Sequence, residues 1–191
     1  MLYRLSVSPY RDRFVLKGAM LFTLWAPVPY RATGDLDLLG FGENAPAAIA
    51  GVRLDFVAEL AGARLPMHVD IGYGDVITPD PVDTEYPSLL GQPAPHLRAY
   101  PPETVVAEKF QAMVALDMLN SRMKDFFDLW AIAGAPAFEG EVLARAIQTT
   151  FERRETRLPT ENATGADGGL RRGKGSPVGG VFEADRDRSC T

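Results

Sequence analysis

The chain has 191 residues, 46% hydrophobic and 24% charged, a balance typical of a globular protein with one domain, or one domain and a small satellite. Its net charge of −5 gives no broad basic field of the kind that binds nucleic acid, although a local basic groove stays open. One cysteine and two histidines exclude a disulfide framework and argue against structural zinc. No apolar run reaches the roughly 18 residues of a membrane span and no signal peptide is visible, so we expect a cytoplasmic protein with no membrane partner.

The first third of the chain predicts strands around one short helix. Residues 14–16 indicate a strand, and the following helix is expected to open at Gly18 and to end at the prolines of residues 27–29. In "RATGDLDLLG", residues 31–40, two leucines alternate with two aspartates, which is typical of a strand buried on one face. "FGENAPAAIAG" reads as a loop with at most one helical turn.

A hairpin, a connector and three helices are expected next. The alternating runs 52–60 and 67–73 predict two strands joined by the turn "LAGARLP". Seven of the fifteen prolines lie between Pro79 and Pro102, which predicts an extended, loop-like connector. Beyond it, "PETVVAEKFQAMVALDML", "SRMKDFFDLWAIAG" and "EGEVLARAIQTTFERR" predict helices, the first with an apolar stripe of Val106, Phe110 and Met113.

The fold class that follows is α+β, with strands first and helices second. Residues 160–191 hold seven of the eighteen glycines without periodicity, which indicates disorder, and we assign this segment no function. The expected division is a sheet domain at 1–78, the connector at 79–102, a helical subdomain at 103–158 and a disordered tail at 159–191.

Asp35 and Asp37 carry the first chemical signal. Residues i and i+2 of a strand point to the same face, so both carboxylates can converge on one divalent cation. Carboxylates are ligands that Mg²⁺ prefers, often together with substrate phosphates. By itself the pattern more often marks a solvated edge strand. Asp70, on the polar side of the second hairpin strand, strengthens the metal interpretation, because three neighbouring carboxylates repel one another without a cation.

The second signal is "LKGAMLF". A strand that enters a helix through a glycine presents backbone N–H groups and a positive dipole end to phosphate. Lys17 and Gly18 are therefore candidates for binding a nucleotide, and Arg31 and Thr33 could add a phosphate contact and a hydroxyl donor. Each of these residues alone is more often structural.

Gly18, "RATGDLD" and Asp70, in this order, resemble the polymerase-beta-like nucleotidyltransferase superfamily. Together with "ETVVAEKFQAMV" and "NSRMKDFFDLW", they resemble the AbiEii-type nucleotidyltransferases, toxins of bacterial toxin–antitoxin systems, over roughly residues 2–154. The resemblance implies a small mixed sheet followed by a helical subdomain. It also implies that Lys109 and Asp125 belong to the active site. From the residues alone, Lys109 could instead snorkel to solvent, and Lys124 could pair with Asp128 as helix support.

The activity implied by the resemblance is Mg²⁺-dependent transfer of an NMP from an NTP to a hydroxyl acceptor. The acceptor would be RNA, with tRNA one candidate, and an antitoxin encoded alongside would be a partner. Asp35, Asp37 and Asp70 would be the metal ligands, and Asp70 would help to deprotonate the acceptor. Alternatives are an inactive remnant or binding module of the family and a small-molecule nucleotidyltransferase of the antibiotic-modifying kind. The remnant is favoured by Ala19 after the loop glycine and by the tail, which is unlike a coherent C-terminus. It is also favoured by an apparently shortened N-terminal part and an apparent deletion near residue 50.

Overall fold

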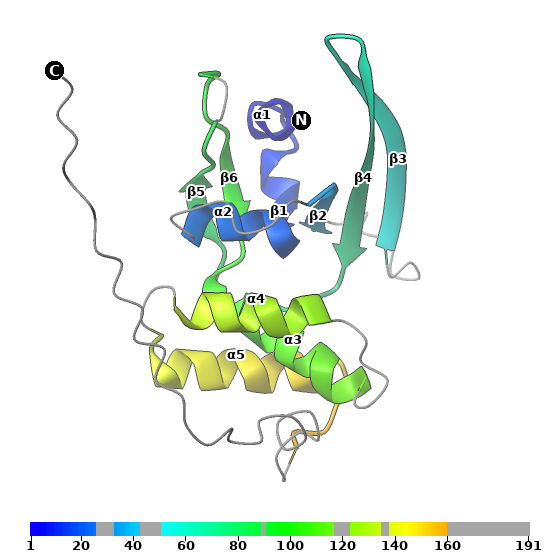
Figure 1. Cartoon of the computed structure of the whole chain (residues 1–191). Coiled ribbons are helices and arrows are strands. Elements are labelled where there is room, and N and C mark those ends of the chain that lie inside the picture. The colour runs from blue at the N-terminus through cyan, green and yellow to red at the C-terminus, as the bar shows by residue number, and fades with distance from the viewer. Residues whose placement is uncertain (26–32, 43–50, 89–90, 117–122, 135–137, 160–191) are drawn as a thin grey trace, which may run out of the picture.

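A computed structural model describes residues 1–25, 33–42, 51–88, 91–116, 123–134 and 138–159. The expected helix end at residues 27–29, the candidate Arg31, most of the loop near residue 46 and the tail at 160–191 lie outside these residues. Figure 1 shows the strands in the upper part of the molecule and the longer helices packed together beneath them. In the described part of the chain no helix is long and apolar enough to cross a bilayer.

The sheet is mixed and has six strands in the order β3-β4-β2-β1-β6-β5. Strand β1 runs antiparallel to β2 and parallel to β6, β2 runs parallel to β4, and the outer pairs β3–β4 and β5–β6 are antiparallel. The strands are β1 (Phe14–Lys17), β2 (Asp35–Gly40), β3 (Gly51–Leu60), β4 (Ala63–Tyr73), β5 (Val82–Glu85) and β6 (His96–Ala99).

The helices are short before the sheet is complete and longer after it. They are α1 (Leu2–Ser6), the 3-10 turns η1 (Arg11–Arg13) and η2 (Gly18–Leu21), α2 (Phe22–Trp25), α3 (Pro102–Leu116), α4 (Met123–Ala133) and α5 (Gly140–Arg153). The expected helix at Gly18 therefore starts as a 3-10 turn and becomes α-helical only at Phe22. The α+β plan predicted from the sequence is confirmed.

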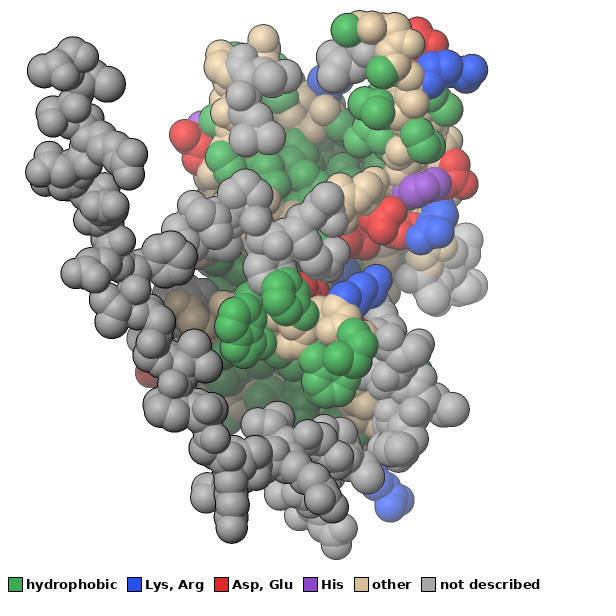
Figure 2. Space-filling view, in the orientation of Figure 1, with side chains coloured by type: hydrophobic (Ala, Val, Ile, Leu, Met, Phe, Trp, Pro, Cys, Tyr) green, Lys and Arg blue, Asp and Glu red, His purple; other side chains and the backbone are tan. Residues whose placement is uncertain are grey.

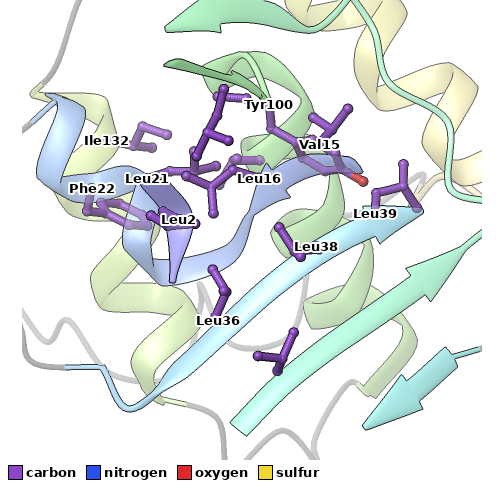
Figure 3. Close-up of a cluster of buried hydrophobic side chains, with 14 residues drawn as sticks. Leu2, Val15, Leu16, Leu21, Phe22, Leu36, Leu38, Leu39, Tyr100 and Ile132 are labelled. Carbon is purple, nitrogen blue, oxygen red and sulfur yellow. The ribbon is translucent and has the colours of Figure 1, made fainter. Parts of the chain in front are cut away.

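One apolar core joins the sheet to helices from both ends of the chain. The buried leucines of β2 and β1 meet side chains of α1, η2 and α2, and Val105 of α3 and Ile132 of α4 belong to the same cluster. Figure 3 shows this packing around β1 and β2. Because each buried aliphatic side chain stabilises the fold by roughly 1.5 to 3 kcal/mol, the leucines of β2 fix this strand in the core.

The β3–β4 hairpin is longer than expected. Residues 61 and 62 alone form the turn, both with positive φ, which matches the two-residue turns that suit the twist of a hairpin. The predicted turn "LAGARLP" was too long, because Arg64 and Pro66 already lie in β4, opposite Glu59 and Val57.

The proline-rich stretch was wrongly predicted to be loop throughout. Strands β5 and β6 lie in it, and β6 pairs with β1 through Val15–Arg98 and Leu16–Ala99. Proline removes one ladder donor, so it is tolerated beside or at the edge of a sheet, and here the strands fit between prolines.

The stripe predicted for α3 is also not its most buried side. Val106, Phe110 and Met113 are half-buried, while Val105 and Ala107 are buried together with Thr104 and Gln111. The apolar pattern misled because α3 has neighbours on several sides, and polar partners meet its deepest side. Phe110 nevertheless packs on Phe151 of α5, with 5.4 Å between ring centroids.

Candidate active site

A lateral row of charged residues crosses four strands on one face of the sheet. Lys17 of β1 lies opposite Asp37 of β2, Asp37 opposite Asp70 of β4, and Asp70 opposite Arg53 of β3. Cross-strand neighbours point to the same face, so the row reads plus, minus, minus, plus. Asp35 starts a second row on this face. Figure 2 shows acidic, basic and histidine side chains gathered between the sheet and the helices.

The second row is formed by Asp35, His68 and Asp55. His68 of β4 lies opposite Asp35 and contacts the carboxylate of Asp55 on β3 through Nδ1. The structure therefore brings Asp35, Asp37 and Asp70 to adjacent strands on one face, as expected, and adds positive or titratable groups beside them.

Gly18 lies against the side chain of Asp37. A Cβ on Gly18 would meet Asp37 Oδ2 at 2.0 Å, and the φ of Gly18 is +75°, a conformation that favours glycine. The strand-to-helix glycine therefore permits a close approach of backbone to carboxylate.

Burial and like charges act on Asp37. Its pKa is raised, first by burial, and further by the carboxylates of Asp70 and Asp35, although the ammonium groups of Lys17 and Lys124 oppose the rise. A carboxylate in this position favours a proton or a cation.

Asp70 is held by Arg53. Arg53 Nε donates to Asp70 Oδ1 at 2.7 Å and Nη2 donates to Oδ2 at 2.6 Å. This fork keeps the pKa of Asp70 below its usual range, with the hydrogen bond as the main cause.

The expected three-carboxylate metal site is not formed as the side chains stand. Among the described residues, no group of three or more His, Cys, Asp or Glu side chains is arranged to hold a metal ion. The physical reason is the pair of hydrogen bonds from Arg53, which holds the carboxylate of Asp70 toward β3. Asp35 and Asp37 remain a pair of hard oxygen ligands, and Mg²⁺ is commonly held by one or two protein carboxylates plus substrate phosphates. The donor set therefore fits a metal that arrives with its nucleotide.

The ammonium group of Lys17 is engaged by acidic side chains. Its Nζ lies 2.7 Å from Asp75 and 3.5 Å from Glu108 of α3, over the ring of Tyr100. Despite burial, its pKa is raised by these carboxylates. The suggestion that Lys17 binds the nucleotide is therefore not supported by its contacts.

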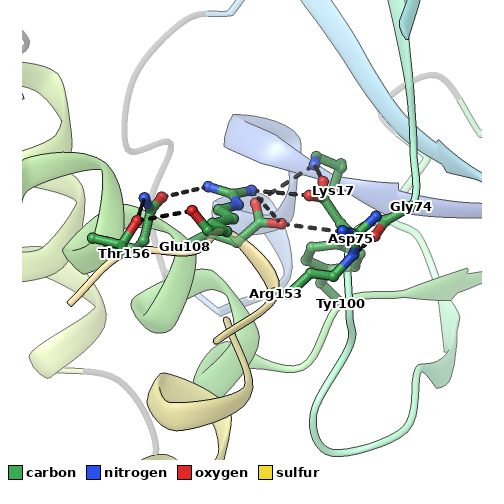
Figure 4. A network of polar contacts seen from close by, with 9 residues as sticks. Lys17, Gly74, Asp75, Tyr100, Glu108, Arg153 and Thr156 are labelled. Atoms are coloured by element: carbon green, nitrogen blue, oxygen red, sulfur yellow. Dashed lines mark hydrogen bonds and ion pairs between the residues drawn. The ribbon is translucent and has the colours of Figure 1, made fainter. Parts of the chain in front are cut away.

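Arg154, just after α5, completes this ion-pair network. It reaches Asp75 and Glu108 at 3.1 Å each, and Gln111 at 2.9 Å. Figure 4 shows the network bridging the sheet and the helices. Since the pKa of Glu108 is raised chiefly by burial and that of Asp75 is lowered by its cationic neighbours despite burial, Asp75 carries the firmer negative charge.

Thr33 approaches the start of β2. Its hydroxyl donates to the carbonyl of Asp35, and the Asp35 N–H donates to the Thr33 hydroxyl, both at 3.4 Å. These long, exposed contacts leave the hydroxyl at the edge of the site.

Lys109 lies between two helices. Its Nζ is 3.0 Å from Asp125 and 2.6 Å from Asp128, both buried on α4. The alternative that Lys109 extends to solvent is therefore wrong, because only 15% of its side chain is exposed. Lys109, Asp125 and Asp128 form an ion-pair group between α3 and α4. Their membership of the active site, which the resemblance implies, stays a prediction.

Sequence reasoning missed the partners of the candidate residues. Arg53 stands at a polar position of an alternating strand, and the register that places it beside Asp70 depends on the two-residue turn. Lys124 was read only as helix support, yet its charge acts on Asp37. Asp75 and Arg154 carry no local signal, because they are 79 residues apart and meet only in the folded chain.

An acidic strand beside a glycine-led helix start is the kind of arrangement that binds a metal and a nucleotide phosphate. Sequence comparison gives the particular family: residues 1–51 and 41–173 match the family described as "Nucleotidyl transferase AbiEii toxin, Type IV TA system". The chain belongs to this family and is a nucleotidyltransferase.

A solved structure is also similar. It is an antigenic nucleotidyltransferase-like protein from Paracoccidioides brasiliensis, 13% identical, with a TM-score of 0.39 over 74% of this chain and 80% of that one. No curated protein matches the sequence.

Proposed function

We propose that this nucleotidyltransferase moves an NMP from an NTP to a hydroxyl of RNA in a Mg²⁺-dependent reaction, with tRNA the first acceptor to test. The observation that carries the proposal is the position of Asp35 and Asp37 on β2, on the face where Gly18 approaches Asp37, in a chain of this family.

Asp35 and Asp37 would hold the metal. Their strand is fixed by the buried leucines that alternate with them, so both carboxylates are placed before a ligand arrives. When bound, Mg²⁺ would neutralise phosphate charge and orient the triphosphate. The raised pKa of Asp37 supports this role, because a cation relieves the repulsion among the carboxylates.

The transfer itself is a displacement at the α-phosphorus. The acceptor oxygen bonds to phosphorus, the bond from phosphorus to the bridging oxygen breaks, and pyrophosphate leaves with the electron pair. Asp70 would accept the hydroxyl proton. Because Arg53 lowers the pKa of Asp70, it also weakens Asp70 as a base, so we expect Arg53 to release this carboxylate during the reaction.

Other candidate residues would position the phosphates. Gly18 opens η2 with backbone N–H groups near Asp37, and Thr33 offers a hydroxyl at the rim. Arg31 would add a cation. Lys109, held by Asp125, would contribute positive charge from the helical side, because this chemistry depends mostly on positioning and electrostatics.

The family description motivates the biological part of the proposal. The chain would act as the toxin of a toxin–antitoxin pair in the cytoplasm, where NTPs and RNA occur, and an antitoxin would be its partner.

The test is transfer of label. The protein is incubated with each of the four labelled NTPs, Mg²⁺ and total RNA, and the RNA is separated and counted. We expect one or two NTPs to label an RNA band and Asp35→Ala to abolish the label. No label above the Asp35→Ala control with any NTP would contradict the proposal.

The second candidate is a binding module of the same family without turnover. Its supporting observation is the Arg53–Asp70 fork, which occupies the carboxylate assigned as base. Arg53→Ala distinguishes the candidates. A binding module would bind Mg²⁺ and NTP both as wild type and as Arg53→Ala, and neither protein would transfer label.

A further inference from the structure

Helix α4 presents an apolar side to solvent. Met123, Phe127 and Trp130 follow at i, i+4 and i+7, which places them on one face, and Trp130 is 72% exposed and Phe127 46% exposed. The opposite side of α4 is buried at Asp125 and Ile132. A helix whose outer face carries two exposed aromatic side chains is a candidate for ligand contact.

The two rings are already arranged as a stacked pair. The centroids of Phe127 and Trp130 lie 5.7 Å apart, with 24° between the ring planes. Stacked, exposed rings offer a flat π surface, and nucleobases of any identity stack on such surfaces.

The aromatic face adjoins the candidate active site. Lys124 precedes Phe127 by three residues, so the two are surface neighbours on α4. Figure 2 shows hydrophobic side chains over α4 next to the charged side chains at the sheet. The charge of Lys124 acts on Asp37, which agrees with this placement. A polymer bound across this side of the molecule would therefore lie over both the charged side chains and the aromatic face of α4.

We propose that Phe127 and Trp130 form a stacking platform for a nucleobase of the single-stranded acceptor RNA, beside its reacting end. Lys124 would face the phosphate that adjoins the stacked base. The inference deepens the proposed function, since it rests on RNA as the acceptor. The ligand chemistry is a nucleobase, which the NTP also carries, so the test has an arm for each source.

The experiment is a binding titration without Mg²⁺, so that transfer plays no part. A labelled single-stranded RNA of about ten nucleotides is titrated with wild type, Trp130→Ala, Phe127→Ala and Trp130→Phe, by anisotropy. Tyr3→Ala is the matched control, because Tyr3 is an aromatic residue of α1 exposed to a similar degree, 43%. Circular dichroism and thermal melting verify that each variant is folded.

We expect Trp130→Ala to raise the Kd for RNA by about 5- to 100-fold, which is the range for loss of one stacked base, with Phe127→Ala in the same direction. Trp130→Phe should keep most of the affinity, and Tyr3→Ala all of it. In a parallel arm that contains Mg²⁺ and NTP but no RNA, the Kd for NTP should stay unchanged in Trp130→Ala.

Three results would overturn the inference. An unchanged Kd for RNA in both alanine variants removes the platform. A loss confined to NTP assigns the rings to the donor nucleotide. The third result is an unchanged RNA affinity of the alanine variants together with a lower molecular mass than wild type in solution, measured by light scattering. It would assign the rings to contact between copies of this chain.

These results are separable from failure of the proposed function. RNA binding that depends on Trp130, without transfer from any NTP, would retain the platform and reject the reaction. Transfer that proceeds with an unchanged KM for RNA in Trp130→Ala would retain the reaction and reject the platform.

Discussion

Arg53 grips the carboxylate of Asp70 with two hydrogen bonds across the β3–β4 pair, and Asp70 stands directly beside Asp37. The arrangement controls the charge of Asp70, because the fork lowers its pKa. It also determines which carboxylates are available to a metal in the resting protein.

Arg53→Ala is therefore expected to raise the pKa of Asp70 toward its ordinary value or above, because Asp37 then acts without a counterion. The acidic limb of the pH profile of kcat/KM should move to higher pH. The titration of the Asp70 carboxyl followed by NMR gives the same information without turnover. Arg64→Ala, an exposed change on the same hairpin, is the control and should leave both curves in place.

The pH dependence of the stability of Arg53→Ala tests whether the pKa of Asp70 is lowered in the native protein. A lowered carboxyl pKa stabilises the fold above the ordinary value of 3.8, and this contribution is lost as the pH falls through the native pKa. Wild type should therefore be the more stable protein near neutral pH, and the difference should disappear in acid. A difference that grows in acid would contradict the assignment.

Gly18→Ala tests the close approach to Asp37. The added methyl would occupy the space of Asp37 Oδ2, and the alanine would have to adopt the strained positive φ of Gly18. We therefore expect a loss of about 1 to 3 kcal/mol of stability and a displaced Asp37 carboxylate. Gly34→Ala is the matched control, because nothing lies within 4 Å of its Cβ position. Urea denaturation and label transfer measure the two effects. Equal behaviour of the two variants would show that the approach at Gly18 has no role.

The sequence pattern located the strands that carry chemistry better than it located their partners. Period-2 alternation predicted β2 because Leu36 and Leu38 are buried and the aspartates are not, which is a local property. The same alternation predicted an apolar face for β3, yet Leu54 on that face is 48% exposed, because alternation shows which residues share a face and not whether another layer covers it.

Long-range contacts decided the rest of the site. Lys17 reads locally as a phosphate ligand next to a glycine, but Asp75, Glu108 and Arg154 determine where its ammonium lies. Strands β5 and β6 were missed because proline composition outweighed four-residue patterns that gain their hydrogen bonds only beside β1. Register and ion pairing across more than fifty residues are not visible in local spacing.

Lys109→Met should strongly destabilise the protein. It leaves Asp125 and Asp128 buried with less positive charge nearby, a change that typically costs about 3 to 5 kcal/mol. The triple variant Lys109→Met, Asp125→Asn, Asp128→Asn removes all three charges and should recover much of that loss, as measured by denaturant unfolding. If label transfer returns with stability in the triple variant, Lys109 is structural. If stability returns without transfer, the proposed role in catalysis is supported.

Lys17→Met tests the sheet-to-helix network. The variant leaves Asp75 and Glu108 with Arg154 as their cation, and we expect a loss of about 3 kcal/mol. Because the pKa of Lys17 is raised, its contribution is full below the ordinary value of 10.5 and is lost only at higher pH. Lys17→Met with Glu108→Gln restores the charge balance and should be the more stable of the two variants. An NTP affinity that falls in both, despite restored stability, would return Lys17 to the nucleotide site.

In the protein without metal, the charge of Asp37 is expected to destabilise the fold. The pKa of Asp37 is raised by burial and by like charges, so the ionised carboxylate destabilises the apo fold once the pH exceeds the ordinary value of 3.8. Asp37→Asn should raise the apo stability near neutral pH by about 1 kcal/mol, with no gain at strongly acidic pH, where both proteins lack the charge.

Binding of Mg²⁺ and NTP should make wild type more stable than Asp37→Asn. Mg²⁺ with NTP binds only the native state and raises the wild-type melting temperature by mass action, whereas Asp37→Asn lacks a ligand and should show little shift. Thermal melting of both proteins, apo, with Mg²⁺ alone and with Mg²⁺ plus NTP, measures this. Glu141→Gln, an exposed carboxylate-to-amide change on α5, is the control. A shift of the same size in wild type and Asp37→Asn would place the metal and nucleotide elsewhere, since a site built on β2 cannot lose Asp37 without losing affinity.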